Sequence, residues 1–167
     1  DARAIKKICD ELHLDPLFEL SKSGNGIHIW FFFETLVRAS EARKLGDILI
    51  TKAMDISDCI DMSSYDRMFP NQDFVAPDAL GNLIALPLHF GSRRENKTVF
   101  IDINTMQVFN VQWEVLKEVK KLSSYELNIV IKKNTILNNL DEESLIPWEI
   151  KRKVPIQFPQ NTKAVVF

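Results

Sequence analysis

Hydrophobic residues recur with a helical period in two segments of the chain. Residues 2–13 and 39–54 each place their apolar positions on one face, so the pattern predicts two amphipathic helices. The positions that share a face are Ile5, Ile8, Cys9 and Leu12 in the first segment and Ala42, Leu45, Leu49 and Ala53 in the second. Asp15 and Pro16 end the first helix, because proline lacks the amide that a helix interior needs.

A run of β-branched and aromatic residues, IHIWFFF over residues 27–33, predicts a strand. Because this run is apolar on both faces, we expect the strand to lie in the centre of a sheet. Alternation places His28, Trp30 and Phe32 on one face. Shorter strands are predicted over residues 17–21, 65–69, 82–88 and 98–103.

The remaining segments predict further helices and, at the end of the chain, an irregular tail. Residues 111–122 are predicted to form a third helix, and the capping-box spacing of Ser123 and Glu126 predicts the start of a fourth. This order of elements predicts an α+β domain over residues 1–148, with helices packed on a mixed or antiparallel sheet. The three prolines of PWEIKRKVPIQFPQ predict that residues 149–167 form a linker or an extended tail.

The composition is ordinary for one globular domain, with 167 residues of which 46% are hydrophobic and 26% charged. No apolar run reaches the ~20 residues that span a membrane, and no signal peptide is recognisable, so we expect a cytoplasmic protein with no membrane partner. Cys9 and Cys59 form no CxxC pair, which argues against a structural zinc site. The net charge of −2 is not typical of nucleic-acid-binding domains, so nucleic acid would require a local basic patch.

The segment SKSGNGIHIW, from Ser21 to Trp30, carries the most informative chemistry. Glycines on both sides of Asn25 let the backbone turn sharply and approach a ligand closely. Ser23, Asn25 and the amides of such a turn are suited to phosphate oxygens, and His28 follows at the start of the strand. We predict that this imidazole contacts a triphosphate. The alternative is an ordinary turn followed by a core histidine whose hydrogen bonds are satisfied.

A second polar segment, YDRMFPNQD over residues 65–73, gathers two carboxylates and an arginine around one proline. Asp66 or Asp73 is suited to a divalent metal, because hard cations prefer carboxylate oxygens. Arg67 is suited to a phosphate, which a guanidinium binds through two hydrogen bonds. The alternative is a polar turn with side-chain capping.

A third segment follows the predicted strand NLIALPL. Arg93, Arg94 and Lys97 form the best local basic cluster and are suited to the phosphates of a template strand. The alternative is a solvated loop, in which such charges contribute little.

Together and in this order, SxSGNGxHxWxFF, YDRxFPNQD and GNLIALPL with its basic loop and VFID resemble the archaeo-eukaryotic primase domain of TOTE conflict systems. The resemblance runs from about Asp1 to about Trp148. It implies a primase-like catalytic core with an RRM-like sheet, and template-directed nucleotidyl transfer in primer synthesis or DNA polymerisation. Its substrates would be nucleoside triphosphates, its metal Mg²⁺ or Mn²⁺ and its template DNA, with helicase and nuclease domains in the same polypeptide.

The resemblance also assigns residues. The histidine after the glycine turn contacts the incoming nucleotide's phosphates in such domains, which carries over to His28, and Ser23 matches the serine of that motif. The metal-binding acid corresponds to Asp66, with Asp73 as the second choice. Two further positions suit phosphate contacts, those of Arg67 and Arg93.

One feature departs from the family pattern. Relatives carry an acidic pair on a strand before the first helix, whereas this sequence begins at that helix. Two-metal nucleotidyl transfer needs several carboxylates, so we expect this fragment to bind nucleotide weakly and polymerise poorly, while its parent protein is active. Two other functions stay open. One is a non-catalytic module that stacks single-stranded bases on Trp30 and Phe32; the other is a nuclease that uses Glu149-Ile150-Lys151.

Overall fold

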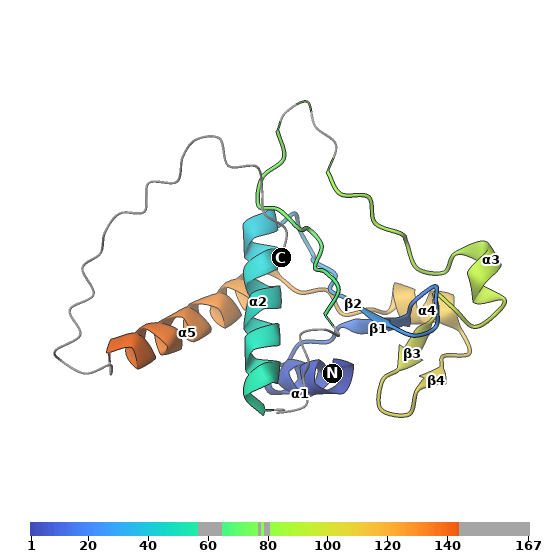
Figure 1. Cartoon of the computed structure of the whole chain (residues 1–167), viewed down its shortest axis with the longest axis horizontal. Helices are drawn as coiled ribbons and strands as arrows, with labels where there is room; N and C mark the ends of the chain where they lie inside the picture. The colour runs from blue at the N-terminus through green and yellow to red at the C-terminus, as the bar shows by residue number, and fades with distance from the viewer. Residues whose placement is uncertain (57–64, 77, 79–80, 144–167) are drawn as a thin grey trace.

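The computed structural model describes residues 1–56, 65–76, 78 and 81–143, with side chains as far as Thr135 in the last range. Pairs of strands are separated by helices along the chain, which confirms a mixed α+β fold (Figure 1). The helices are α1 (Ala2–Glu11), α2 (Ala39–Ile56), α3 (Phe90–Arg93), α4 (Gln112–Lys117) and α5 (Ser124–Glu143). The strands are β1 (Leu17–Leu20), β2 (Ile27–Trp30), β3 (Phe100–Asp102) and β4 (Gln107–Val108). The predicted tail over residues 149–167 lies outside the described residues.

The sheet is antiparallel, with the strand order β2-β1-β3-β4. The short strand β1 is therefore internal and β2 lies at an edge, so the prediction that residues 27–33 form a central strand is wrong. The strand ends at Trp30, and the following Phe31 and Phe33 pack with the helices instead of the sheet. The run is thus apolar throughout because its residues enter two different hydrophobic cores, not because one strand is covered on both faces.

Two hydrophobic clusters hold the elements together. The first joins α1, α2 and α5, whose buried residues include Ile8, Leu45 and Leu127. The second surrounds β1 and β3, where Phe18 and Phe100 are buried. Figure 1 shows this division, with α1, α2 and α5 on one side of the view and the sheet with α3 and α4 on the other. None of the helices in the described part of the chain has the length and apolar character of a membrane span.

The helix predictions are largely confirmed. α2 covers its predicted segment, and α1 ends two residues before the end of its own. α5 begins at the predicted capping box, where the amide of Ser123 donates to Glu126 Oε2 at 2.9 Å and the amide of Glu126 donates to Ser123 Oγ at 3.2 Å. The third helix is shorter than predicted, because α4 ends at Lys117. The short elements α3 and β4 were not predicted, since four and two residues are too few to show a period.

Two predicted strands are absent from the described residues. Residues 65–69 and 82–88 have no regular structure. The apolar side chains of the second segment do not enter a core, since Leu83 is 91% exposed and Leu86 is also exposed, whereas Leu88 is buried. The first segment packs on α2 instead of joining the sheet, with Met68 against Gly46.

Candidate functional site

The glycine turn between β1 and β2 is organised by Ser21. The Ser21 hydroxyl accepts a hydrogen bond from the amide of Gly26 at 3.0 Å and lies 2.9 Å from the hydroxyl of Ser23. The amide of Ser21 donates to the carbonyl of Gly26 at 2.8 Å, which closes the turn. Gly24 has a φ of +81°, a left-handed conformation that glycine adopts without a steric penalty. Asn25 lies exposed at the tip.

A buried carboxylate stands behind the predicted histidine. Glu19 of β1 is paired in register with His28 of β2, and its side chain is 1% exposed. Glu19 Oε2 lies 3.2 Å from His28 Nδ1 and accepts a hydrogen bond from Trp30 Nε1 at 2.6 Å. The His28 side chain is 51% exposed. Glu19 therefore holds the imidazole through Nδ1, and no hydrogen bond to its other nitrogen, Nε2, is formed by the part of the chain that the structure describes.

The aromatic residues beside His28 take a structural role. Trp30 donates to Glu19 and packs against the sheet cluster. Its ring lies 6.5 Å from that of Phe32 and at 25° to it, a stacked arrangement that confirms the two side chains share a face. Both rings are half-buried, so they are poorly placed to offer open faces to a base.

The basic loop lies against the glycine turn. The amide of Thr98 donates to the carbonyl of Leu20 at 2.8 Å, which brings residues 97 and 98 beside the end of β1. The Lys97 side chain reaches over the turn, since its Cε lies 3.7 Å from the position that a Cβ on Gly24 would occupy. Two of the three segments that carry the predicted chemistry therefore converge.

The third segment, with both predicted metal ligands, is engaged elsewhere. Asp66 forms a two-pronged ion pair with its neighbour Arg67, at 3.1 and 3.2 Å, so Arg67 is occupied as well. Asp73 lies 2.9 Å from Nε of Arg43 on α2. Among the described residues neither aspartate contacts His28. The structure thus does not bring these predicted ligands to the histidine by direct contact.

The resemblance implies a divalent metal ion, and such an ion would need several carboxylate or imidazole ligands close together. In residues 1–56, 65–76, 78 and 81–135, no three His, Cys, Asp or Glu side chains stand close enough to share an ion. Each candidate aspartate is already neutralised by an arginine. The described side chains alone therefore do not fit a metal centre.

The predicted Arg93 lies in an aromatic setting instead of in a bare loop. Its guanidinium carbon is 5.4 Å from the ring centre of Phe90 and 5.9 Å from that of Trp113. Arg94 lies 4.3 Å from the ring centre of Phe90. α3 and α4 thus present arginines and aromatic rings together.

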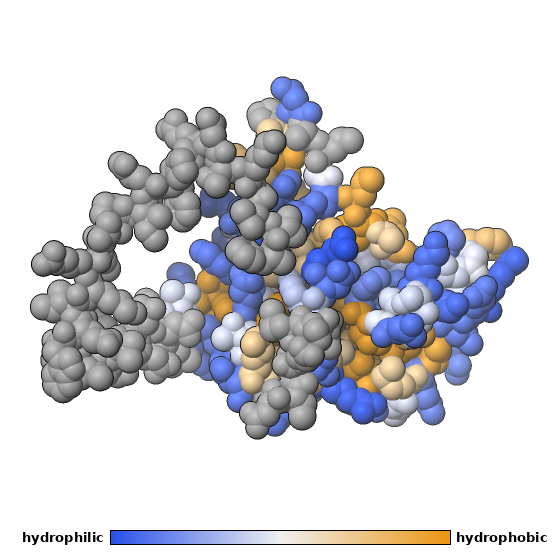
Figure 2. All heavy atoms as spheres, in the orientation of Figure 1, coloured by the Kyte–Doolittle hydropathy of each residue, from blue (hydrophilic) through white to orange (hydrophobic). Residues whose placement is uncertain are grey.

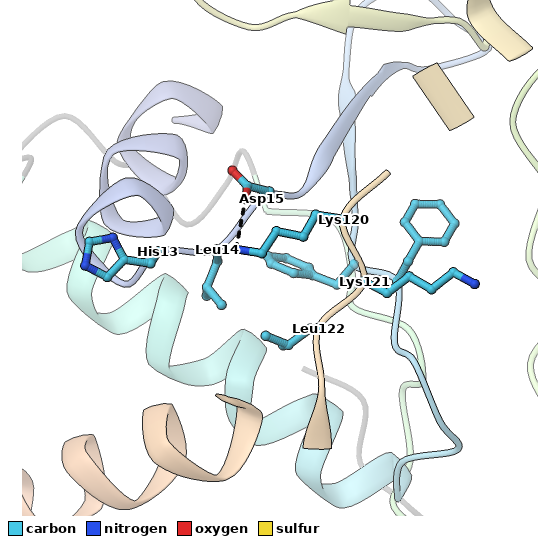
Figure 3. A pocket seen from close by; sticks show the side chains of 8 residues that line it. His13, Leu14, Asp15, Lys120, Lys121 and Leu122 are labelled. Atoms are coloured by element: carbon cyan, nitrogen blue, oxygen red, sulfur yellow. Dashed lines mark ion pairs between the residues drawn. The ribbon is translucent and has the colours of Figure 1, made fainter. Parts of the chain in front are cut away.

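A small hollow lies at the end of α1, where Lys120 approaches Asp15 at 3.4 Å (Figure 3). Its volume is about 10 Å³, which is too small for a substrate. The Lys121 side chain points away from this ion pair in the same view. The hollow lies between the end of α1 and the segment before α5.

Sequence reasoning missed two residues of the site, Glu19 and Ser21. A signal for Glu19 was present, since a single carboxylate within the apolar strand LFEL must either face solvent or find a buried partner. Its partner could be named only once the register of β1 and β2 was known. In the sequence, Ser21 and Ser23 look equivalent. Only the structure shows that the turn closes at Ser21, which exchanges hydrogen bonds with Gly26.

The comparisons with known proteins identify the family of the chain. No curated protein matches the chain closely enough to count as a relative. The family model of the TOTE conflict system archaeo-eukaryotic primase domain matches residues 1–130, which include the glycine turn, His28, the basic loop and α4. The chain therefore belongs to the family of archaeo-eukaryotic primase domains of TOTE conflict systems.

Proposed function

We propose that this chain binds a nucleoside triphosphate at the glycine turn, as part of a DNA primase or polymerase whose parent protein performs template-directed nucleotidyl transfer. The proposal rests mainly on the buried Glu19, whose carboxylate holds Nδ1 of His28. The His28 side chain is half-exposed beside the turn, so its Nε2 can meet a ligand there. A histidine fixed in this way meets a phosphate with little loss of side-chain freedom. The family membership supports the reaction class.

Each group would have a definite task. With Nδ1–H donating to Glu19, a second proton on Nε2 allows His28 to donate to a phosphate oxygen. Lys97 reaches over the turn and is paired with the exposed Glu95 at 2.9 Å, so it would meet a phosphate by exchanging this carboxylate for the ligand. Ser23 and Asn25 lie in the turn itself, where backbone amides and short polar side chains suit phosphate oxygens. These residues bind and orient the triphosphate, and no step is assigned to Asp66 or Asp73.

Nucleotide titration tests the assignment of His28. A fluorescent dATP analogue is titrated in buffer with Mn²⁺ against the wild type, His28→Ala and a control, His13→Asn. Loss of one charge-assisted hydrogen bond of about 1.5–3 kcal/mol should weaken binding about 10- to 150-fold in His28→Ala. The control replaces an exposed histidine of positive φ, where asparagine is well tolerated, and should bind as the wild type does. Equal binding by His28→Ala and wild type would make the assignment wrong.

Primer extension tests the reaction class. The chain alone, and any longer polypeptide that contains it, is supplied with a primed DNA template, deoxynucleotides and Mg²⁺ or Mn²⁺. Extension that is reduced by His28→Ala supports nucleotidyl transfer at this site. If neither the chain alone nor the longer polypeptide extends the primer, although both bind nucleotide, the second candidate is favoured, a non-catalytic nucleic-acid-binding module. The specific support for this candidate is the surface of arginines and aromatic rings on α3 and α4.

A further inference from the structure

An open depression lies between α3, the loop after it and the start of α4. Its volume is about 660 Å³. Residues from two separate parts of the chain line it, including Arg93, Arg94, Asn96, Asn110, Val111 and Trp113. It is distinct from the pair formed by Glu19 and His28, neither of which lines it. We refer to this depression as the α3–α4 groove.

The positive charge of the groove is not neutralised from within. Among the described residues, neither Arg93 nor Arg94 forms an ion pair, whereas the neighbouring Lys97 is paired with Glu95 at 2.9 Å. In a protein of net charge −2, two such arginines side by side are a local excess of positive charge. A polyanion is the complementary partner.

Aromatic rings stand beside these arginines. Phe90 is 61% exposed and Trp113 is 60% exposed, although both are large apolar side chains that a folded protein would normally cover. They belong to different helices, yet Arg93 lies within 6 Å of both ring centres. Figure 2 shows this part of the molecule as mostly hydrophilic, with a small hydrophobic group of atoms at its outer edge. Exposed rings interleaved with guanidinium planes form a platform on which bases stack.

The loop that carries the arginines is held in place. Leu88, Asn96 and Thr98 all have positive φ, between 53° and 60°, which is unusual for residues with a side chain. Thr98 exchanges backbone hydrogen bonds with Leu88 and Leu20, and these fix the loop to the end of β1. The guanidinium groups are therefore presented by an anchored loop, which lowers the entropy lost when a ligand binds.

We infer that the α3–α4 groove binds single-stranded nucleic acid, with Arg93 and Arg94 on the phosphates and Trp113 stacked on a base. A single strand is favoured over a duplex, because only unpaired bases offer faces to Trp113. It is favoured over a peptide, because two unpaired arginines beside exposed aromatic rings match alternating phosphates and bases. Beyond the proposed function, the nucleic-acid strand thus binds at the α3–α4 groove, apart from the triphosphate at the glycine turn. Binding of the strand does not depend on nucleotide binding at His28.

Fluorescence anisotropy of a labelled 20-nucleotide single strand tests this groove, without added nucleotide or metal. The double variant Arg93→Gln/Arg94→Gln should weaken binding tenfold or more. It should also lower the slope of log affinity against log salt by about 0.7 for each phosphate that the arginines no longer neutralise. Trp113→Ala should weaken binding at least fivefold and leave the salt slope unchanged, whereas Trp113→Phe should retain most of the affinity.

The controls separate this site from general charge and from the nucleotide site. Lys132→Ala/Lys133→Ala removes two exposed charges from α5, which lies on the opposite side of the view from α3 and α4 (Figure 1), and should bind as the wild type does. His28→Ala should also bind the strand normally, even if it loses nucleotide. Thermal unfolding of each variant identifies any that fail to fold. Three results overturn the inference: no binding by the wild type, an equal loss in the α5 control, or equal affinity for duplex.

Discussion

At the scale of single residues, the most consequential side chain is a glutamate in an apolar strand. A buried carboxylate is costly unless it is hydrogen-bonded, and Glu19 meets this condition through Trp30 and His28. The bond to His28 also orients the only histidine of the glycine-turn segment. One residue therefore serves both the core and the candidate nucleotide site.

Replacing Glu19 should separate the effect of lost hydrogen bonding from that of lost charge. Glu19→Ala leaves the indole N–H of Trp30 without its acceptor and should cost about 1–3 kcal/mol in the free energy of unfolding. Glu19→Gln keeps a side-chain oxygen in place and should be clearly more stable than the alanine variant. Urea denaturation measures both, with exposed Glu11→Ala as the control. Equal stabilities for the two Glu19 variants would contradict a hydrogen-bonding role.

Cys9 offers a second prediction at this scale. It is fully buried in the cluster of α1, α2 and α5, and burial raises the pKa of its thiol to about 12. At pH 8 only on the order of one thiol in ten thousand would be ionised, so the native protein should react very slowly with iodoacetamide. The variant Cys59→Ser leaves Cys9 as the only cysteine. Its labelling rate should rise sharply in denaturing urea, and rapid labelling of the native variant would contradict the burial.

At the scale of helices and strands, local signals in the sequence were reliable and long-range ones were not. The helical period predicted α1 and α2, and the capping-box spacing predicted the start of α5. The strand order was missed, because residues 27–33 serve the sheet and then the helix cluster, a change of environment that a hydrophobic pattern does not record. Residues 82–88 were mistaken for a strand because their composition is apolar, although most of them are exposed.

The candidate site was predictable in the same uneven way. The glycine turn and His28 were identified from adjacent letters, and the basic residues from their clustering. The approach of Lys97 to Gly24 and the pairing of Glu19 with His28 depend on strand register, which one sequence does not specify. The contact between Arg93 and Trp113 joins residues 20 positions apart through an unpredicted helix, so it also required coordinates.

The capping box of α5 gives a prediction for pH. Hydrogen bonds from the hydroxyl and the amide of Ser123 hold the pKa of Glu126 below its ordinary value. A lowered pKa in the folded state means that the carboxylate stabilises the fold above its ordinary pKa, and that this contribution is lost as pH falls through the folded value. Glu126→Gln should therefore have a lower free energy of unfolding than the wild type at pH 7, and this difference between the two proteins should be smaller at pH 3.5.

Urea denaturation at both pH values measures this gap. Glu118→Gln, which removes an exposed carboxylate just after α4, is the matched control and should show little change at either pH. A gap for Glu126→Gln that stayed constant with pH would show that the carboxylate does not act in its charged form.

At the scale of the whole molecule, the helix cluster and the sheet cluster are joined by chain segments that pass between them. Phe31 and Phe33 carry the chain from β2 into the helices, and the backbone of Phe32 accepts a hydrogen bond from the amide of Leu122 at 2.7 Å. Residues 65–76 lie against α2 through Met68, and through Arg43, which contacts Pro70 and Asp73. This irregular segment is thus placed by α2, not by the sheet, which explains why its aspartates stand apart from His28 in the described contacts.

The packing of Met68 on α2 can be tested with a double-mutant cycle. A Cβ on Gly46 would overlap Met68 Sδ, so Gly46→Ala must displace that side chain. In an open helix position the same change should stabilise the protein by about 1 kcal/mol, because alanine favours the helix. We expect Gly46→Ala to be neutral or destabilising in the wild type and to stabilise the Met68→Ala variant, as measured by urea denaturation. An identical effect in both backgrounds would show that residues 65–76 are not anchored on α2, and the separation of Asp66 and Asp73 from His28 would then lose its structural basis.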